Sequence, residues 1–109
     1  IIIDQALEGA NYRCEHDTTH NTFIAKATGH AYMEGHHLIP MKYQGKFDSS
    51  LDVYANIICL CPICHRRIHY GTDKDREYLA DELFEKRSGR LSNSGLDLTR
   101  NDFLQLLIK

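Results

Sequence analysis

The pattern of apolar and polar residues predicts short elements in the first half of the chain. A short helix is expected within residues 1–10, ended by Gly9. Residues 23–25 (FIA) and 31–33 (AYM) lie on either side of a turn-like TGH stretch and are predicted to be two short strands. Residues 41–52 (MKYQGKFDSSLD) are polar, contain a glycine and predict a loop.

The second half predicts one buried strand followed by three helices. Residues 57–60 (IICL) form a β-branched, apolar run that is typical of a buried strand. A helix is expected to begin at Pro62, where a missing N–H does no harm, and to stop at Gly71. A longer helix is predicted from about residue 74 to residue 86, closed by the polar stretch SGRLSNSG, and a last helix follows Thr99 as its N-cap. The apolar positions of these two later helices are expected to form core and support: Leu79, Leu83, Phe84, Phe103, Leu104, Leu107 and Ile108.

Length and composition indicate an ordinary globular chain. Its 109 residues are enough for one domain with a small core, for which a structural metal would be a useful addition. Hydrophobic residues make up 42% and charged residues 26%, which argues against disorder or a fibre. No apolar run reaches membrane-spanning length and no signal peptide is visible. We therefore expect a soluble, cytoplasmic protein without a membrane partner.

The net charge does not by itself favour nucleic acid. Thirteen basic and fifteen acidic residues give −2 at neutral pH, whereas phosphate-binding domains are usually basic. A bound divalent ion would change the local field more than any one side chain. Four basic residues also flank the metal-like stretches described next: Lys42, Lys46, Arg66 and Arg67.

The CPIC stretch predicts half of a structural zinc site. Cys61 and Cys64 offer two thiolates at the start of a helix, a recurrent half of a tetrahedral zinc site. Upstream, CEHDTTH contains Cys14 and two histidines, and the turn-like DTT favours His20 as the fourth ligand. His16 and Cys59 are the alternatives, and in the simplest structural interpretation Cys14 is only a buried small residue. Such a zinc would contribute to folding, so loss of any ligand is expected to unfold the chain.

Four further histidines suggest a second metal site. His65 and His69 are four apart, one turn along the same helix face, so that both imidazoles can reach one ion. The other two, His36 and His37, are adjacent in EGHHLIP. Neighbours on a regular strand point to opposite faces, so this pair must lie at a strand end or a bulge to share one cleft.

In these motifs, residues 14–71 resemble the HNH endonucleases, the ββα-metal nucleases. The resemblance is carried by EGHHLIP, by Asn56 in YANIICL and by CPICHRRIHYG. It implies an α+β fold, a small zinc-stapled ββα-metal domain with additional C-terminal helices, in which residues 1–109 are one nuclease domain and residues 74–109 are support. The layout around the histidine pair is most similar to HNH domains of restriction nucleases that act on modified DNA.

The resemblance also implies roles for individual residues. His37 would be the general base, His36 would join His65 and His69 on a catalytic divalent ion, and Asn56 would hold the loop that aims His37. Imidazole ligands accept Zn²⁺, Ni²⁺, Mn²⁺ or Co²⁺, and Mg²⁺ if waters complete its shell. The expected reaction is hydrolysis of DNA to a 5′-phosphate and a 3′-hydroxyl, in restriction or in defence against foreign or modified DNA.

Three neighbouring side chains each have two alternative roles. Arg66 and Arg67 are either solvated helix residues or bidentate clamps for a phosphate. Glu34 shares a strand face with His36 and is expected either to orient that ring or to serve only structure. His16 and His30 are interpreted as ordinary surface or hydrogen-bonded histidines.

Other functions fit the sequence less well. A metalloprotease HExxH motif would need a glutamate where HRRIH has Arg66. A thiol redox protein would need a βαβ pattern around CPIC, and the sequence does not show one. A non-catalytic zinc module that binds DNA or protein is the main alternative, but it has no need for an unligated His37 or for Asn56. DNA recognition is expected from a separate domain or protein, double-strand cutting from a homodimer, and the abrupt ends at Ile1 and Lys109 suggest a piece of a longer protein.

Overall fold

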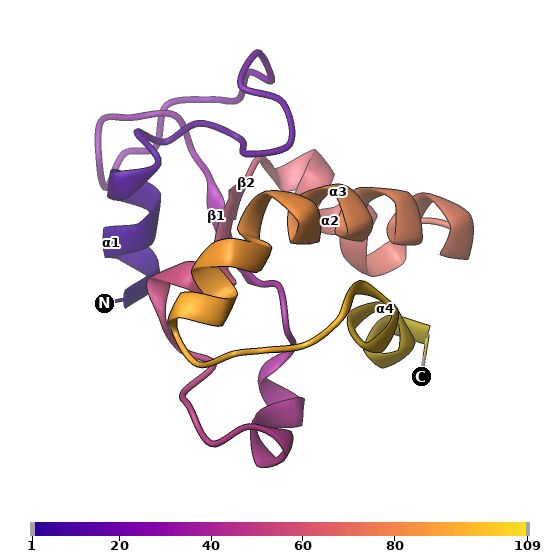
Figure 1. Ribbon diagram of the computed structural model, residues 1–109. Coiled ribbons are helices and arrows are strands. Elements are labelled where there is room, and N and C mark those ends of the chain that lie inside the picture. Colours follow the sequence, from indigo (N-terminus) through magenta and orange to yellow (C-terminus); the bar gives the residue numbers. More distant parts are fainter. Residues whose placement is uncertain (1, 109) are drawn as a thin grey trace.

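The computed structural model describes residues 2–108 and places a two-stranded antiparallel sheet between helices (Figure 1). In chain order the elements are α1 (Ile2–Gly9), β1 (Glu34–His37), the 3₁₀ helices η1 (Met41–Lys46) and η2 (Tyr54–Asn56), β2 (Ile57–Leu60), α2 (Pro62–Tyr70), α3 (Asp73–Asn93) and α4 (Arg100–Ile108). The expected α+β architecture, with a ββα unit followed by supporting helices, is confirmed. None of the helices described is both long and apolar enough to cross a membrane.

Helices lie on both sides of the small sheet. All four residues of β2 are buried, as its apolar sequence predicts, because α1 covers one face and α2 the other (Figure 1). Gly35 allows α1 to come this close, since a β-carbon at Gly35 would lie 2.6 Å from a side-chain carbon of Ile3. Any larger residue at Gly35 would therefore push α1 away from the strand that carries the histidine pair.

The helix predicted after CPIC is confirmed as α2. Cys61 is its N-cap and accepts a hydrogen bond from the Cys64 N–H, while Pro62 occupies the first turn and Gly71 follows the last residue. Residues 57–71 thus form a strand, a tight turn and a helix, which places two thiols at the start of α2 and two imidazoles further along it.

The two strands predicted at residues 23–25 and 31–33 are wrong. The structure has only an isolated bridge between Ile24 and Ala31, and the strand lies just downstream at β1. Phe23 and Ile24 are 63% and 65% exposed, so no second layer covers this hairpin-like segment. Phe23 stacks on Tyr32 instead, with ring centroids 4.8 Å apart. Three apolar residues in a row were too short a signal to distinguish a strand from an exposed turn.

Residues 41–52 are more ordered than the predicted loop. They contain η1, and the Gln44 side chain fastens the segment that follows: its amide donates to the Ser49 carbonyl and its oxygen accepts from the Leu51 N–H, both at 2.8 Å. Leu51 is fully buried. The connection between the strands is therefore a defined arch rather than a free loop.

The helix predicted to end near residue 86 continues to Asn93 as α3. Leu83, Arg87 and Leu91 follow one another at spacings of four, and all three are buried, so the packed face continues through the polar stretch. A glycine inside a helix, such as Gly89, lowers the stability of that helix by only about 1 kcal/mol relative to alanine, and burial of the neighbouring side chains of α3 outweighs this. The helix is instead closed by Gly95, whose φ of +79° lets the Leu96 N–H reach the Leu91 carbonyl.

The last helix is predicted correctly. Thr99 caps α4 by accepting from the Asp102 N–H, and Phe103 stacks on Phe84 of α3 with ring centroids 4.6 Å apart. Phe103 and Leu104 are buried and Leu107 packs at the edge of the core. The expected packing of the Ile108 side chain lies outside the described residues.

Candidate metal centres and active site

The structure brings Cys14, His20, Cys61 and Cys64 together at the start of α2. One ligand atom from each lies within 4.8 Å of the others. His20 Nδ1 is 3.6 Å from Cys61 Sγ and 3.3 Å from Cys64 Sγ. In a tetrahedral zinc site with bonds of about 2.0–2.3 Å, ligand atoms lie roughly 3.5 Å apart. The residues present therefore fit a zinc ion in both donor type and spacing.

A tight turn delivers His20 to this cluster. The Asp17 carboxylate accepts from the Thr19 N–H at 2.9 Å and from the Thr19 hydroxyl at 2.6 Å, and the His20 N–H bonds to the Asp17 carbonyl. The Thr19 hydrogen bonds lower the pKa of Asp17, which keeps this carboxylate ionised as an acceptor. The turn-like DTT sequence thus forms the turn that the second pair of ligands needs.

Neither of the alternative ligands joins this cluster. Cys59 is fully buried in β2, and burial raises its pKa to about 12, so its thiol stays protonated within the core. His16 Nδ1 lies 2.8 Å from Glu82 Oε1 on α3, and His30 stacks on Tyr12. Cys59 is thus a core residue, and His16 and His30 are a hydrogen-bonded and a stacked histidine outside the metal cluster.

A second cluster joins β1 to α2. His36, His65 and His69 each offer one ring nitrogen, and these nitrogens lie within 4.8 Å of one another. The three pairs of ring centroids are separated by 4.9 to 5.4 Å. His65 Nε2 and His69 Nε2 face each other at 3.2 Å, an arrangement of two ring nitrogens that a shared cation would stabilise. The donor set fits a divalent transition ion or Zn²⁺.

The environments of His36 and His69 favour the neutral imidazoles that a metal requires. Burial, followed by the charges of His69, His65 and His37, lowers the pKa of His36 to about 3. Burial and the neighbouring His65 also lower the pKa of His69. Rings that are already neutral at pH 7 can take up an ion without first losing a proton.

Glu34 contacts a different histidine from the one expected. Its Oε1 lies 2.7 Å from His65 Nδ1, and its Oε2 accepts from the Tyr32 hydroxyl at 2.9 Å, whereas His36 was the expected partner. The hydrogen bond from His65 is the main cause of the lowered pKa of Glu34. A carboxylate on Nδ1 fixes the proton there and leaves Nε2 of His65 free to bind an ion.

His37 lies outside this cluster, at the last position of β1. The register pairs His36 with Ile58 and His37 with Ile57 without a bulge, so the two neighbouring rings leave opposite faces of the strand. His37 thus occupies the strand end, without a bulge, and its ring does not lie on the strand face that carries His36. The His37 side chain is 21% exposed, and its Nε2 lies 2.9 Å from the Asp52 carboxylate.

Asn56 ties together the two ends of the arch that carries His37 and Asp52. Its side chain is fully buried, accepts from the Ile39 N–H at 2.8 Å, and donates to the carbonyls of Ile39 and Leu51. Its own carbonyl accepts from the Leu38 N–H. Asn56 thus fixes the backbone just after His37 and just before Asp52. Sequence reasoning missed Asp52, because it lies fifteen residues from His37 in a polar loop and matches no motif.

The two arginines of α2 differ in their environment. Arg67 donates two hydrogen bonds of 2.6 Å to Asp75 at the start of α3, so its guanidinium fork is engaged in an ion pair rather than open to a phosphate. Arg66 is exposed on the helix. Of the pair that the sequence offered as clamps, only Arg66 has an open guanidinium.

A family model described as HNH endonuclease matches residues 14–71, which hold both clusters, His37 and Asn56. The chain belongs to the HNH endonuclease family. The HNH chain is also 38% identical over 56 residues to the Type IV methyl-directed restriction enzyme EcoKMcrA of Escherichia coli (strain K12). This similarity covers 51% of the present chain and 18% of that relative, so the chain spans less than a fifth of the length of the protein it matches.

Proposed function

We propose that this HNH chain is a metal-dependent endonuclease that hydrolyses phosphodiesters of DNA. The observation that supports this most directly is a three-imidazole cluster, His36, His65 and His69, together with a fourth histidine, His37, that follows His36 in β1 and is held by Asp52 outside the cluster. A purely structural zinc module would need the cysteine cluster but not this second arrangement. The cysteine cluster would then hold the structural Zn²⁺ that keeps the N-terminal loop against α2.

In the proposed reaction His37 is the general base. With Asp52 accepting the proton on Nε2, Nδ1 of His37 keeps its lone pair and can take a proton from an attacking water. Asn56 keeps both partners in place through the backbone of the arch. The divalent ion would supply positive charge to the phosphate and to the leaving 3′ oxygen. Attack in line with that oxygen gives a 5′-phosphate and a 3′-hydroxyl.

The remaining residues of the site would bind and orient. His36, His65 and His69 hold the divalent ion, which the donor set leaves open among Mg²⁺, Mn²⁺, Ni²⁺, Co²⁺ and Zn²⁺. Glu34 holds the His65 ring in the tautomer that presents Nε2. Arg66 remains a candidate contact to the DNA phosphates.

Changing Glu34 to glutamine is expected to lower the affinity of the histidine trio for Mn²⁺ by roughly 10- to 100-fold, because the His65 ring loses its ionised acceptor. Calorimetric titration of the zinc-loaded chain with Mn²⁺ measures this. Glu85→Gln, which removes an exposed carboxylate from α3, is the matched control and should leave the affinity unchanged. Equal affinities for both variants would show that Glu34 does not orient the ligand.

The biological setting is proposed from the relative. Since that protein is a methyl-directed restriction enzyme, we propose that the present chain also acts in restriction or in defence against foreign or modified DNA. The four cysteines form no disulfide, which suits the reducing cytoplasm. Target selection would come from a separate domain or protein, and a homodimer would allow both strands to be cut.

Plasmid nicking after metal removal tests the proposed activity. The zinc-loaded chain, freed of loosely bound metal by mild chelation, is expected to leave supercoiled plasmid intact and to nick it when Mn²⁺, Mg²⁺, Ni²⁺ or Co²⁺ is added back. Ligation of the nicked product without prior phosphorylation would confirm 5′-phosphate and 3′-hydroxyl ends. A folded wild-type chain that is inactive with every metal would contradict the proposal and favour a non-catalytic zinc module that binds DNA or protein.

A further inference from the structure

The carboxylate that contacts His65 is itself held at its other oxygen. Glu34 Oε1 lies 2.7 Å from His65 Nδ1, and Glu34 Oε2 accepts a hydrogen bond of 2.9 Å from the Tyr32 hydroxyl. This hydrogen bond raises the pKa of Tyr32, so the hydroxyl remains a donor at neutral pH. A carboxylate that is bound at one oxygen can still rotate, whereas one that is bound at both oxygens is fixed. Tyr32 therefore determines how firmly Glu34 is held against the His65 ring.

The Tyr32 ring is held in turn by the segment that precedes it. The Tyr32 N–H donates to the Phe23 carbonyl at 2.8 Å, and the two rings stack with centroids 4.8 Å apart and an angle of 16° between their planes. The bridge between Ile24 and Ala31 closes the same hairpin-like segment. Phe23 is 63% exposed and adds little to the core, but its stacked face restricts rotation of the Tyr32 ring.

A positive charge nearby offers Glu34 a different partner. The hydrogen bond from His65 is the main cause of the lowered pKa of Glu34, and the charge of Arg66 acts in the same direction. The charge of Arg66 also opposes the rise in the pKa of Tyr32 that Glu34 causes, so the guanidinium lies close enough to act on both groups. In the structure Glu34 nevertheless pairs with His65 and not with Arg66.

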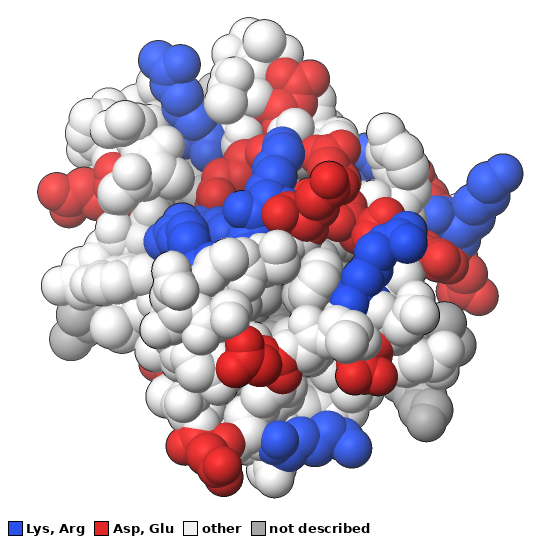
Figure 2. Space-filling view, in the orientation of Figure 1, with Lys and Arg blue, Asp and Glu red and all other residues white. Residues whose placement is uncertain are grey.

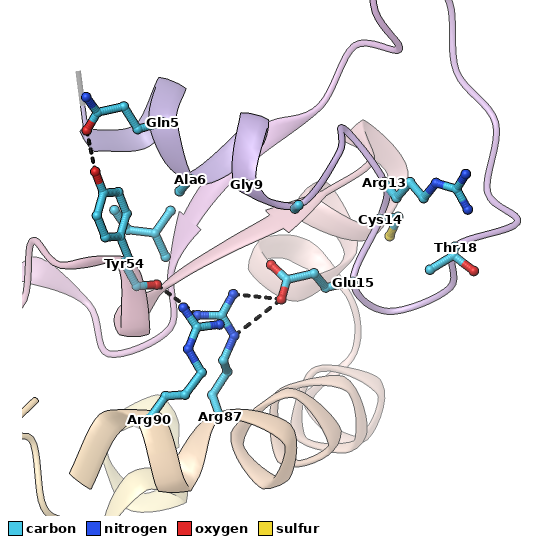
Figure 3. Close-up of a pocket in the computed structure, with 12 residues that line it drawn as sticks. Gln5, Ala6, Gly9, Arg13, Cys14, Glu15, Thr18, Tyr54, Arg87 and Arg90 are labelled. Carbon is cyan, nitrogen blue, oxygen red and sulfur yellow. Dashed lines mark hydrogen bonds and ion pairs between the residues drawn. The ribbon is translucent and has the colours of Figure 1, made fainter. Parts of the chain in front are cut away.

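Other arginines of this chain take carboxylate partners. Ion pairs join Arg67 to Asp75, Arg87 to Glu15 and Arg100 to Asp81. Figure 3 shows the pair of Arg87 with Glu15, and Figure 2 shows Lys and Arg side chains bordered by Asp and Glu side chains over α3. Arg66 is exposed on α2 and its guanidinium is open. A Glu34 side chain that is released from Tyr32 would therefore turn toward Arg66 for part of the time, and His65 would lose its acceptor.

We propose that Tyr32, supported by Phe23, is a positioning residue for the catalytic ion, because it holds Glu34 against His65 and away from Arg66. A proton kept on Nδ1 of His65 leaves Nε2 for the ion. Tyr32 acts through Glu34 and touches neither the ion nor the substrate. The inference rests on the proposed function for the role of the histidine trio, but it concerns binding of the ion and not cleavage of DNA.

Binding of Mn²⁺ by the zinc-loaded chain tests this role. Tyr32→Phe keeps the ring and its stack but removes the hydroxyl, and it is expected to weaken Mn²⁺ binding roughly fivefold in calorimetric titration, the usual effect of one lost hydrogen bond. Phe23→Ala is expected to weaken binding roughly two- to threefold, because the Tyr32 ring loses its stacking partner. Tyr54→Phe is the matched control, since it removes a hydroxyl that donates to Gln5 of α1, outside the histidine trio (Figure 3), and it should bind Mn²⁺ like the wild type.

A second substitution separates positioning from a general loss of structure. Arg66→Gln removes the competing partner of Glu34, so it should restore most of the Mn²⁺ affinity of the Tyr32→Phe chain and change the affinity of the otherwise unmodified chain less. Equal effects of Arg66→Gln in both chains would contradict the competition for Glu34. In the zinc-loaded chain without Mn²⁺, ¹⁵N NMR reports the proton on Nδ1 of His65, and Tyr32→Phe is expected to lower the fraction of this tautomer.

The outcomes distinguish this inference from the proposed activity. If Tyr32→Phe binds Mn²⁺ as tightly as Tyr54→Phe, Tyr32 does not position the ion, whether or not the wild type cleaves DNA. If Phe23→Ala keeps the wild-type affinity, the stack does not support Tyr32. If Tyr32→Phe binds Mn²⁺ weakly while the wild type cleaves no DNA, the positioning role stands and the proposed activity fails. A wild-type histidine trio that binds no divalent ion would overturn both.

Discussion

Replacement of Cys64 by alanine is expected to unfold the chain. Cys64 is 1% exposed and its sulfur belongs to the cluster that joins residues 14–20 to the start of α2. Residues 10–33 contain no helix and only an isolated bridge, and besides the cluster they are tied to the rest of the chain mainly by the polar contacts of Glu15 with Arg87 and Cys59 and of His16 with Glu82. Structural zinc contributes on the order of 10 kcal/mol to folding, which is comparable to the whole stability of a small domain.

The chain contains a matched control for this prediction. Cys59 is also fully buried and lies two residues before the knuckle, but it is outside the metal cluster. Cys59→Ala should cost only about 1 kcal/mol, the usual effect of a small cavity. Circular dichroism, thermal melting and elemental analysis compare the two variants. Cooperative melting of Cys64→Ala close to the wild-type temperature, or a wild type that stays folded after complete zinc removal, would contradict a structural metal.

Chemistry that depends on short sequence spacing could be predicted from the sequence. The CPIC knuckle, the histidines one turn apart on α2 and the turn at residues 17–19 are local patterns, and local backbone geometry brings their side chains together. The strand at residues 57–60 and the cap at Thr99 follow from equally local rules. These are the features for which the structure agrees with the sequence.

Partners that are distant in the sequence could not be predicted. The pairing of Glu34 with His65 depends on how β1 meets α2, and the pairing of His37 with Asp52 depends on how the arch folds back. The Glu15 and Arg87 pair likewise spans seventy-two residues. The same cause explains the wrong end of α3, since the buried positions Arg87 and Leu91 keep it helical through a stretch that looks polar in isolation.

Replacement of His37 by alanine is expected to reduce DNA cleavage by roughly 10²- to 10⁴-fold, or about 3–5 kcal/mol in the barrier, through loss of the general base. The change removes no ligand of either cluster, so zinc content and Mn²⁺ affinity should match the wild type. Single-turnover cleavage of a duplex in Mn²⁺ measures the rate. His30→Ala, which alters an exposed histidine that stacks on Tyr12, is the control and should cleave normally.

Variants of Asp52 are expected to reduce DNA cleavage less than His37→Ala does. The His37 and Asp52 side chains are 21% and 48% exposed, and such surface pairs contribute only about 0–1 kcal/mol to stability, so variants should fold. Asp52→Ala is expected to lower the cleavage rate roughly tenfold without weakening DNA binding, because the His37 ring loses the acceptor that keeps its proton on Nε2. Asp52→Asn should recover most of the rate, since the amide oxygen can still accept. If His37→Ala cleaves at the wild-type rate, another group activates the water. If His37→Ala is slow but both Asp52 variants cleave at the wild-type rate, His37 acts without an orienting carboxylate.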